Sequence, residues 1–277
     1  MNALRSVLVH LDGSPRAAER LRMARSLAAA QGATVTAMLA VNPALVEVPL
    51  SALGDAGGAV LLQEAEAQRR RDARALFDRE NEGPGPTMRW AEAGPGLGAM
   101  AFADQALYAD LMVLGQHDRH DALAWGVPSD FPALMLLHGG RPALLVPSAG
   151  HFSGTGLRIL VAWKPTREAA HAVTAALPLL QAARQVHVVT WEEPVTAQPA
   201  AEGLGDYLAL HGVQPRWERG GPAGADVGEL LLSRAADLDA DLIVMGGYGH
   251  ARAREWLLGG ATRTVLQSMT VPVLMSH

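Results

Sequence analysis

The chain carries one arrangement of residues twice, and this internal repeat constrains its fold more than any other feature. The apolar run Val7–Leu11 precedes an Asp12-Gly13-Ser14 turn, and 152 residues later Ile159–Trp163 precedes Lys164-Pro165-Thr166, so that Ser14 and Thr166 fall at equivalent helix N-cap positions. The helical stripes behind them match at the same offset, Ala17, Leu21, Ala24 and Ala28 corresponding to Ala169, Val173, Ala176 and Leu180. Such a repeat indicates two copies of one domain.

Later segments repeat as well, and they set the limits of the two copies. The run Ala109–Gly115 corresponds to Ala240–Gly246, and the closing run Arg141–Val146 corresponds to Val271–Met275. Between the copies lies Ser148–Gly156, which is rich in Gly and Ser and offers little to pack. We therefore predict a first domain over residues 1–147, a linker over 148–156 and a second domain over 157–277.

Short runs of Val, Ile and Leu alternate with helical patterns in each copy. Continuous apolar strands are typical of parallel sheets that are buried on both faces. We expect strands near residues 6–11, 35–41, 88–92, 111–114 and 143–146, and near 158–162, 186–190, 214–218, 242–245 and 272–275, with a charged helix around Glu64–Glu80. The predicted fold class is α/β, with two tandem Rossmann-like three-layer domains, each a five-stranded parallel sheet flanked by helices.

Composition excludes several classes of function. The formal net charge is −5 and aromatic residues make up 5%, which argues against nucleic-acid binding. The chain has no cysteine, so disulfides, thiolate nucleophiles and cysteine-ligated metal sites are excluded. Residues 1–9 lack the pattern of a signal peptide, and no stretch has the roughly 18 uninterrupted apolar residues of a membrane helix. We expect a cytoplasmic protein with no membrane partner.

A glycine-rich loop in the second copy is the strongest candidate for a binding site. Gly246-Gly247-Tyr248-Gly249 follows the fourth strand, and nine residues later Gly259–Thr262 opens a helix. Ligands of parallel α/β sheets bind beyond the carboxyl ends of the strands. Glycine lets the backbone approach a ligand, and the free N–H groups of a helix N-terminus attract anions. The spacing alone fits a phosphate site and a pair of surface turns equally well.

The spacing Gly246-x2-Gly249-x9-Gly259 resembles the Gly-x2-Gly-x9-Gly-Ser/Thr pattern of the universal stress protein family. The flanking runs Ala240–Gly246 and Val265–Leu274, and the turn that begins at Asp12, resemble that family too. The resemblance covers both halves and implies a tandem member, with five parallel strands and four helices in each domain. It further implies that the chain is a stress-response binding module, because some members bind ATP or other adenine nucleotides. Domains of this family pair through their fifth strands.

The first copy departs from the family pattern at its glycine loop. It keeps Asp12 and Val41, where the resemblance places contacts to the nucleotide. However, Asp118 and Asp130 stand where the family has glycine or a hydroxyl residue. Their negative charge opposes the binding of phosphate. We therefore predict a degenerate nucleotide loop in the first domain.

The second copy keeps the glycines but departs elsewhere. Lys164 stands where the family has Asp, and Gly260 replaces the Ser/Thr, which leaves only a backbone N–H. Lysine cannot accept a hydrogen bond from a ribose but can pair with a phosphate. The residues that the resemblance assigns to ATP or another adenine nucleotide, with Mg in the case of ATP, are Ala162, Lys164, Trp191, Met245, Gly246, Gly249, Gly259, Gly260 and Ala261 in the second copy and Asp12 and Val41 in the first.

No arrangement of residues indicates catalysis, so we expect a binding protein and not an enzyme. The run His117–Asp121 has residue types that ligate metals, but Arg119 lies among them, and we interpret the run as a polar surface loop. Two alternatives stay open: a scaffold that binds no nucleotide, and a slow metal-dependent ATPase. The fifth strands, Ala143–Val146 and Val271–Met275, are expected sheet edges that pair either with each other, as an intrachain pseudo-dimer, or in a homodimer.

Overall fold

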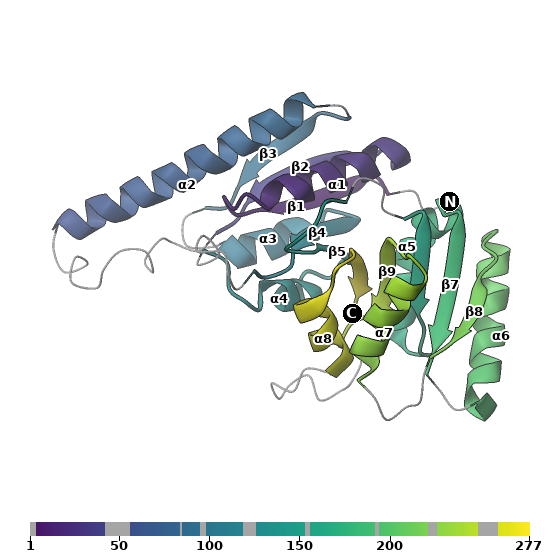
Figure 1. Cartoon of the computed structure of the whole chain (residues 1–277). Coiled ribbons are helices and arrows are strands. Elements are labelled where there is room, and N and C mark those ends of the chain that lie inside the picture. The colour runs from purple at the N-terminus through teal and green to yellow at the C-terminus, as the bar shows by residue number, and fades with distance from the viewer. Residues whose placement is uncertain are drawn as a thin grey trace. The chain divides into compact units, whose positions relative to one another are not determined.

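The computed structural model describes residues 4–41, 56–83, 85–94, 98–118, 126–152, 156–191, 194–220, 226–248 and 260–277. The chain divides into two compact units, Leu4–Arg141 and Pro142–His277, which we call the first and the second unit. Each unit has strands with helices packed against them (Figure 1). No described helix combines the length and the apolar character needed to cross a membrane.

The described part of the first unit contains a parallel sheet in the order β3-β2-β1-β4. Its strands are β1 (Ser6–Leu11), β2 (Thr34–Leu39), β3 (Met88–Glu92) and β4 (Leu111–Gly115). Its helices are α1 (Ala17–Gln31), α2 (Ala56–Glu82), α3 (Gly98–Ala106) and α4 (Phe131–His138). Because β1 lies at the centre, Val7, Val9 and Leu11 are fully buried.

Local chemistry fixes where α1 begins and ends. It ends at Gly32, whose φ of 68° is a left-handed conformation that glycine adopts without strain. At its other end the N-cap residue is Arg16, and no side chain caps the helix. The expectation that Ser14 caps α1 is therefore wrong, because the Ser14 hydroxyl donates instead to Asp12 Oδ1 at 2.6 Å. The equivalent prediction for Thr166 is confirmed, since its side chain accepts from the N–H of Ala169 at 3.4 Å.

The second unit has its strands in the order β5-β10-β9-β6-β7-β8. They are β5 (Ala143–Val146), β6 (Arg158–Ala162), β7 (Gln185–Thr190), β8 (Arg216–Arg219), β9 (Leu242–Gly246) and β10 (Val273–Ser276). The helices are α5 (Arg167–Ala182), α6 (Pro194–Leu210), α7 (Val227–Asp237) and α8 (Gly260–Ser268). Neighbouring strands are parallel except for β5 and β10, which pair antiparallel with Leu144 opposite Leu274.

The α/β fold and all ten expected strands are confirmed, most of them to within two residues at each end. The charged helix expected around Glu64–Glu80 is confirmed as part of α2. Of the two pairings that the sequence left open for the fifth strands, the structure contains the one within the chain. This ladder places β5, which the sequence assigned to the first domain, in the second compact unit. The domain limits and the 148–156 linker stay predictions.

Candidate functional site

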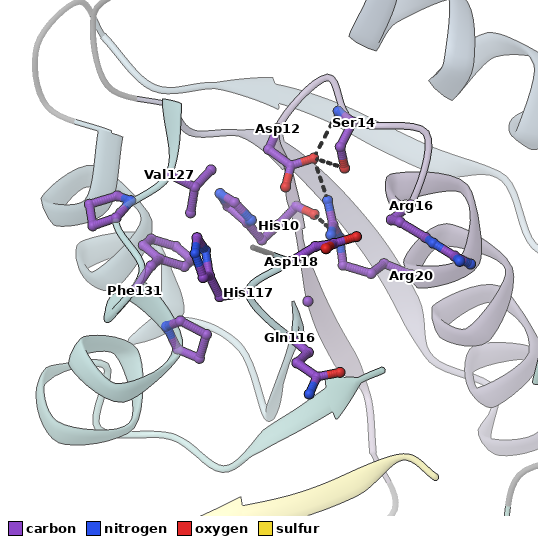
Figure 2. Close-up of a pocket in the computed structure, with 13 residues that line it drawn as sticks. His10, Asp12, Ser14, Arg16, Arg20, Gln116, His117, Asp118, Val127 and Phe131 are labelled. Atoms are coloured by element: carbon purple, nitrogen blue, oxygen red, sulfur yellow. Dashed lines mark hydrogen bonds and ion pairs between the residues drawn. The ribbon is translucent and has the colours of Figure 1, made fainter. Parts of the chain in front are cut away.

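A small pocket lies at the carboxyl ends of β1 and β4 in the first unit (Figure 2). Its volume is about 30 Å³. That is room for one or two water molecules, and far too little for a nucleotide. The lining comes from the turn after β1, from α1, from the end of β4 and from the start of α4: His10, Asp12, Ser14, Arg16, Arg20, Gly115, Gln116, His117, Asp118, Val127, Pro128, Phe131 and Pro132.

An ion pair between Asp12 and Arg20 dominates this pocket. Arg20 Nη2 donates to Asp12 Oδ1 at 2.6 Å, and Arg20 Nε donates to the carbonyl oxygen of His10 at 3.0 Å. The same Oδ1 atom accepts from the N–H of Ser14 at 3.0 Å and from its hydroxyl at 2.6 Å. Figure 2 shows the lines from Ser14 and from Arg20 meeting at one oxygen of Asp12. The Arg20 side chain is only 4% exposed and that of Asp12 only 14%, so the pair is largely withdrawn from water.

Gly115, the last residue of β4, makes room for this arginine. A β-carbon at this position would collide with Arg20 Nη1. The guanidinium therefore reaches from α1, past the end of β1, to the end of β4. Sequence reasoning missed Arg20, although a signal was present: the repeat places Ala172, which has no charge to bury, at the equivalent position.

His10 closes the apolar side of the pocket. Its ring lies 4.3 Å from that of Phe131 and 5.4 Å from that of Phe102, measured between centroids. Its Nε2 lies 2.8 Å from the carbonyl oxygen of Ala40, and because a carbonyl can only accept, the proton is on Nε2. Burial, helped by the charge of Arg20 and opposed by Asp12 and the Ala40 carbonyl, lowers the pKa of His10 to about 4. His10 is therefore neutral at pH 7.

Asp12 is ionised under the same conditions. Burial by itself would raise the pKa of its carboxyl. The charges of Arg20 and of His10 once it is protonated, together with the hydrogen bonds from Ser14, outweigh burial and hold the pKa of Asp12 at about 2. The pocket thus contains a carboxylate that is already neutralised by the chain's own guanidinium.

The second unit has a different arrangement at the equivalent edge. Ala162 ends β6 and lies beside Val189 of β7 and Met245 of β9 in the sheet. Gly246 ends β9, where a β-carbon would come within 2.6 Å of the Ala169 backbone nitrogen. The start of α5 therefore packs directly on the end of β9 with no side chain between them. Lys164 is exposed, two residues beyond β6.

Trp191 immediately follows β7 and carries the most informative side chain at this edge. Its indole lies against Gly220, where a β-carbon would collide with the ring nitrogen Nε1. The Nε1 atoms of Trp191 and Trp163 are both buried, and neither finds a hydrogen-bond partner among the described residues. An unsatisfied buried donor costs about 1–3 kcal/mol. A ligand that supplied an acceptor would remove this cost.

The glycine loop lies partly outside the described residues, which stop at Tyr248 and resume at Gly260. Tyr248 has a φ of 59°, a left-handed conformation that is rare for residues other than glycine. Its N–H donates to the Thr262 hydroxyl at 3.5 Å, which links the end of β9 to the first turn of α8. Gly260 and Ala261 begin α8, and a β-carbon at Gly260 would meet open space.

A family model described as the universal stress protein family matches residues 3–125 and 222–277, more than half of the chain. The chain belongs to the universal stress protein family. No curated protein matches it. The family assignment confirms the resemblance read from the glycine spacing and from the turn that begins at Asp12.

Solved universal stress proteins share the fold. One from Archaeoglobus fulgidus DSM 4304 is 14% identical, with 97% of each chain covered and a TM-score of 0.65. A putative one from Pseudomonas aeruginosa UCBPP-PA14 is 22% identical, with 98% of this chain and 92% of that chain covered and a TM-score of 0.57. A universal stress protein in complex with cAMP is 20% identical and covers 53% of this chain and 100% of its own, with a TM-score of 0.36.

Several predicted residues of this universal stress protein lie at the expected edges. Ala162, Met245 and Gly246 are neighbours in the sheet, and Lys164, Trp191, Gly260 and Ala261 lie beyond strand ends or at the start of α8. Gly249 and Gly259 are outside the described residues. The structure describes where these residues lie and contains no ligand, so their role in binding stays a prediction.

The structure also shows where Asp12, Val41 and the two acidic residues of the first-unit loop lie. Asp12 and Asp118 line the pocket, while Asp130 is the N-cap residue of α4 and does not line it. The Val41 carbonyl oxygen lies 2.7 Å from where a β-carbon of Gly98 would be, so Val41 packs on the first residue of α3. Residues 119–121 of the suspected metal-binding run lie outside the described residues, and the described residues contain no cluster suited to a metal.

Proposed function

We propose that the second unit binds an adenine nucleotide, such as ATP, ADP or AMP, and that the protein is a cytoplasmic stress-response module that acts through this binding and not through turnover. The observation that carries the proposal is the buried indole N–H of Trp191, which has no described partner and lies at a position that the family uses for nucleotide contacts. A base or ribose oxygen or nitrogen would satisfy it.

The charges and backbone at this edge fit the phosphate end of such a ligand. Lys164 is exposed beyond β6 and is the cation closest in sequence to the strand end. The first N–H groups of α8 have no partner within the helix, and they carry the positive end of its dipole. Both features favour an anion, and neither supplies a base that would activate water. This is why we favour binding over hydrolysis.

The test is calorimetric titration of ATP, ADP and AMP, with and without magnesium, into protein first freed of co-purified nucleotide. We expect one nucleotide per chain. Trp191→Phe keeps a six-membered aromatic ring and removes the N–H together with the five-membered ring, so it should weaken binding about 5- to 10-fold, the value of one hydrogen bond. Trp217→Phe is the matched control, because Trp217 is 43% exposed on β8 and should leave the affinity unchanged.

Gly249→Asp and Gly259→Asp provide a test of the glycine loop. Each adds a carboxylate to the predicted phosphate segment, and we expect both folded variants to lose ATP binding. Binding equal to wild type in both would refute the proposed site. The absence of any binding to the wild type would favour the scaffold alternative, and phosphate release above a buffer blank with magnesium or manganese would favour the ATPase. A homodimer through the fifth strands stays a prediction, to be tested by light scattering.

A further inference from the structure

We infer that Arg20 is a built-in occupant of the first-unit pocket and that its guanidinium, held by Asp12, keeps nucleosides out of that unit. The inference is separate from the acidic residues noted in the sequence. Asp118 and Asp130 oppose phosphate only, whereas an arginine that fills the pocket excludes the uncharged nucleoside as well.

The contacts of Arg20 show that it is fixed in place. Nε and Nη2 donate to two acceptors, the His10 carbonyl and Asp12 Oδ1, and Nη1 lies over Gly115. Two hydrogen bonds and the close packing of Nη1 on Gly115 hold the planar guanidinium in one orientation. The Arg20 side chain is 4% exposed, so its guanidinium is buried in the pocket and does not lie on the protein surface.

The same contacts occupy one oxygen of the Asp12 carboxylate. Asp12 Oδ1 already accepts hydrogen bonds from Arg20, from the Ser14 N–H and from the Ser14 hydroxyl. The space left over is about 30 Å³. A nucleoside could enter only if the Arg20 side chain moved out of the pocket. The carboxylate of Asp12 would then lose its counter-ion.

The second unit provides an internal comparison, because the repeat gives it an equivalent strand and helix without this side chain. The residue equivalent to Arg20 is Ala172, which is fully buried and carries no polar group, and the residue equivalent to Asp12 is Lys164. Gly246 packs there on the α5 backbone instead of under a guanidinium. The closing arginine is therefore a property of the first unit alone. That the chain then carries a single nucleotide rests on the proposed function.

The experiment replaces Arg20 and follows adenosine, a probe without phosphate, by calorimetry. Arg20→Ala, and Arg20→Gln as a second variant in case the first fails to fold, should each bind one adenosine per chain more than wild type. They should bind ATP more weakly than adenosine, because Asp118 remains. Arg22→Ala is the control, since Arg22 lies two residues further along α1, is half exposed and is paired with Glu19 and Glu80, and it should behave as wild type.

A second substitution locates the gained site. In the Arg20→Ala background, Gly115→Val places side-chain atoms where Nη1 had been and should abolish the gained adenosine. Low millimolar guanidinium chloride should raise the melting temperature of Arg20→Ala relative to the same concentration of NaCl, by refilling the pocket, and should leave wild type unchanged.

The outcomes separate this inference from the proposed function. If wild type binds no nucleotide but Arg20→Ala binds one adenosine, the proposed function fails and the closing role of Arg20 stands. If folded Arg20→Ala and Arg20→Gln bind no more adenosine than wild type, the inference is overturned, even where guanidinium restores stability. Two adenosines per wild-type chain would overturn it as well.

Discussion

The turns that follow β1 and β6 lie at equivalent points of the repeat and each leads into a helix, yet their chemistry is opposite. In the first unit, His10, Asp12 and Arg20 bury a charge pair and a neutral imidazole. At the equivalent positions the second unit has Ala162, Lys164 and Ala172, and of these three residues the ionisable one, Lys164, is exposed. The first unit has an ion pair buried at this edge of its sheet, whereas the second has two buried indole N–H groups without a partner among the described residues.

This difference shows that equivalent positions of a repeat can carry different side-chain chemistry. Both units keep a glycine at the end of the fourth strand, but Gly115 faces a guanidinium while Gly246 faces a helix backbone. In both units the absence of a side chain lets another group lie close to the glycine, which is the Arg20 guanidinium at Gly115 and the α5 backbone at Gly246. A glycine of the family pattern therefore indicates close packing against the backbone. Whether space for a ligand remains depends on the side chain that packs there, which is Arg20 in the first unit.

The largest expected effect comes from transferring the arginine to the second unit. Ala172→Arg should lower the free energy of unfolding by about 3–5 kcal/mol, because the new charge is buried without a carboxylate partner. Ala172→Met, similar in length but uncharged, should cost only about 1–3 kcal/mol for overpacking. Adding Lys164→Asp should recover part of the Ala172→Arg loss, as measured by urea unfolding in a double-mutant cycle. If Lys164→Asp gives no recovery, the two turns are not interchangeable in the way proposed.

Acid should weaken the first unit through His10. In the unfolded chain this group has a pKa of 6.5, and in the folded protein about 4, so only the unfolded state takes up the proton between these values. Stability is thus complete above pH 6.5 and falls toward pH 4, by about 3 kcal/mol if the whole shift is expressed. His10→Gln should flatten this part of the curve of stability against pH. A wild-type curve that is flat from pH 7 to pH 4 would contradict the buried neutral imidazole.

Asp12→Asn should have a somewhat smaller effect. It leaves Arg20 buried without its counter-ion, and we expect a loss of roughly 2–3 kcal/mol at pH 7, less than for a fully buried pair because Asp12 is partly exposed. The lowered pKa of Asp12 means that the wild type gains this stability above pH 4 and loses it as the pH falls toward 2. The difference between wild type and variant should therefore shrink across that window. A constant difference would assign the effect to packing.

The fold could be predicted in detail because parallel α/β strands are continuous apolar runs and the repeat checks each assignment twice. The N-cap of α1 could not be predicted. The Ser14 hydroxyl can either accept from a helix N–H or donate to a carboxylate, and a charged acceptor, Asp12, lies nearby. The sequence predicted a degenerate loop in the first unit and did not predict the pocket filled by Arg20. Asp118 could be recognised because it departs from the family pattern. Arg20 could not, because it lies in a helix outside any motif and its contact with Gly115 depends on three-dimensional packing.

The smallest expected effect compares the two hydroxyls of the turns. Thr166→Ala removes the side-chain cap of α5 and should cost about 1 kcal/mol. Ser14→Ala removes no cap, but it takes one hydrogen bond from the Asp12 carboxylate, so it should cost about 1 kcal/mol and in addition raise the pKa of Asp12. Ser14→Ala should then shift the acid limb of the unfolding curve through Asp12, whereas Thr166→Ala should act on it through Glu168, whose pKa the Thr166 hydroxyl helps to lower. If both variants gave the same pH dependence, the two hydroxyls would have equivalent roles and the contrast between the turns would be lost at this position.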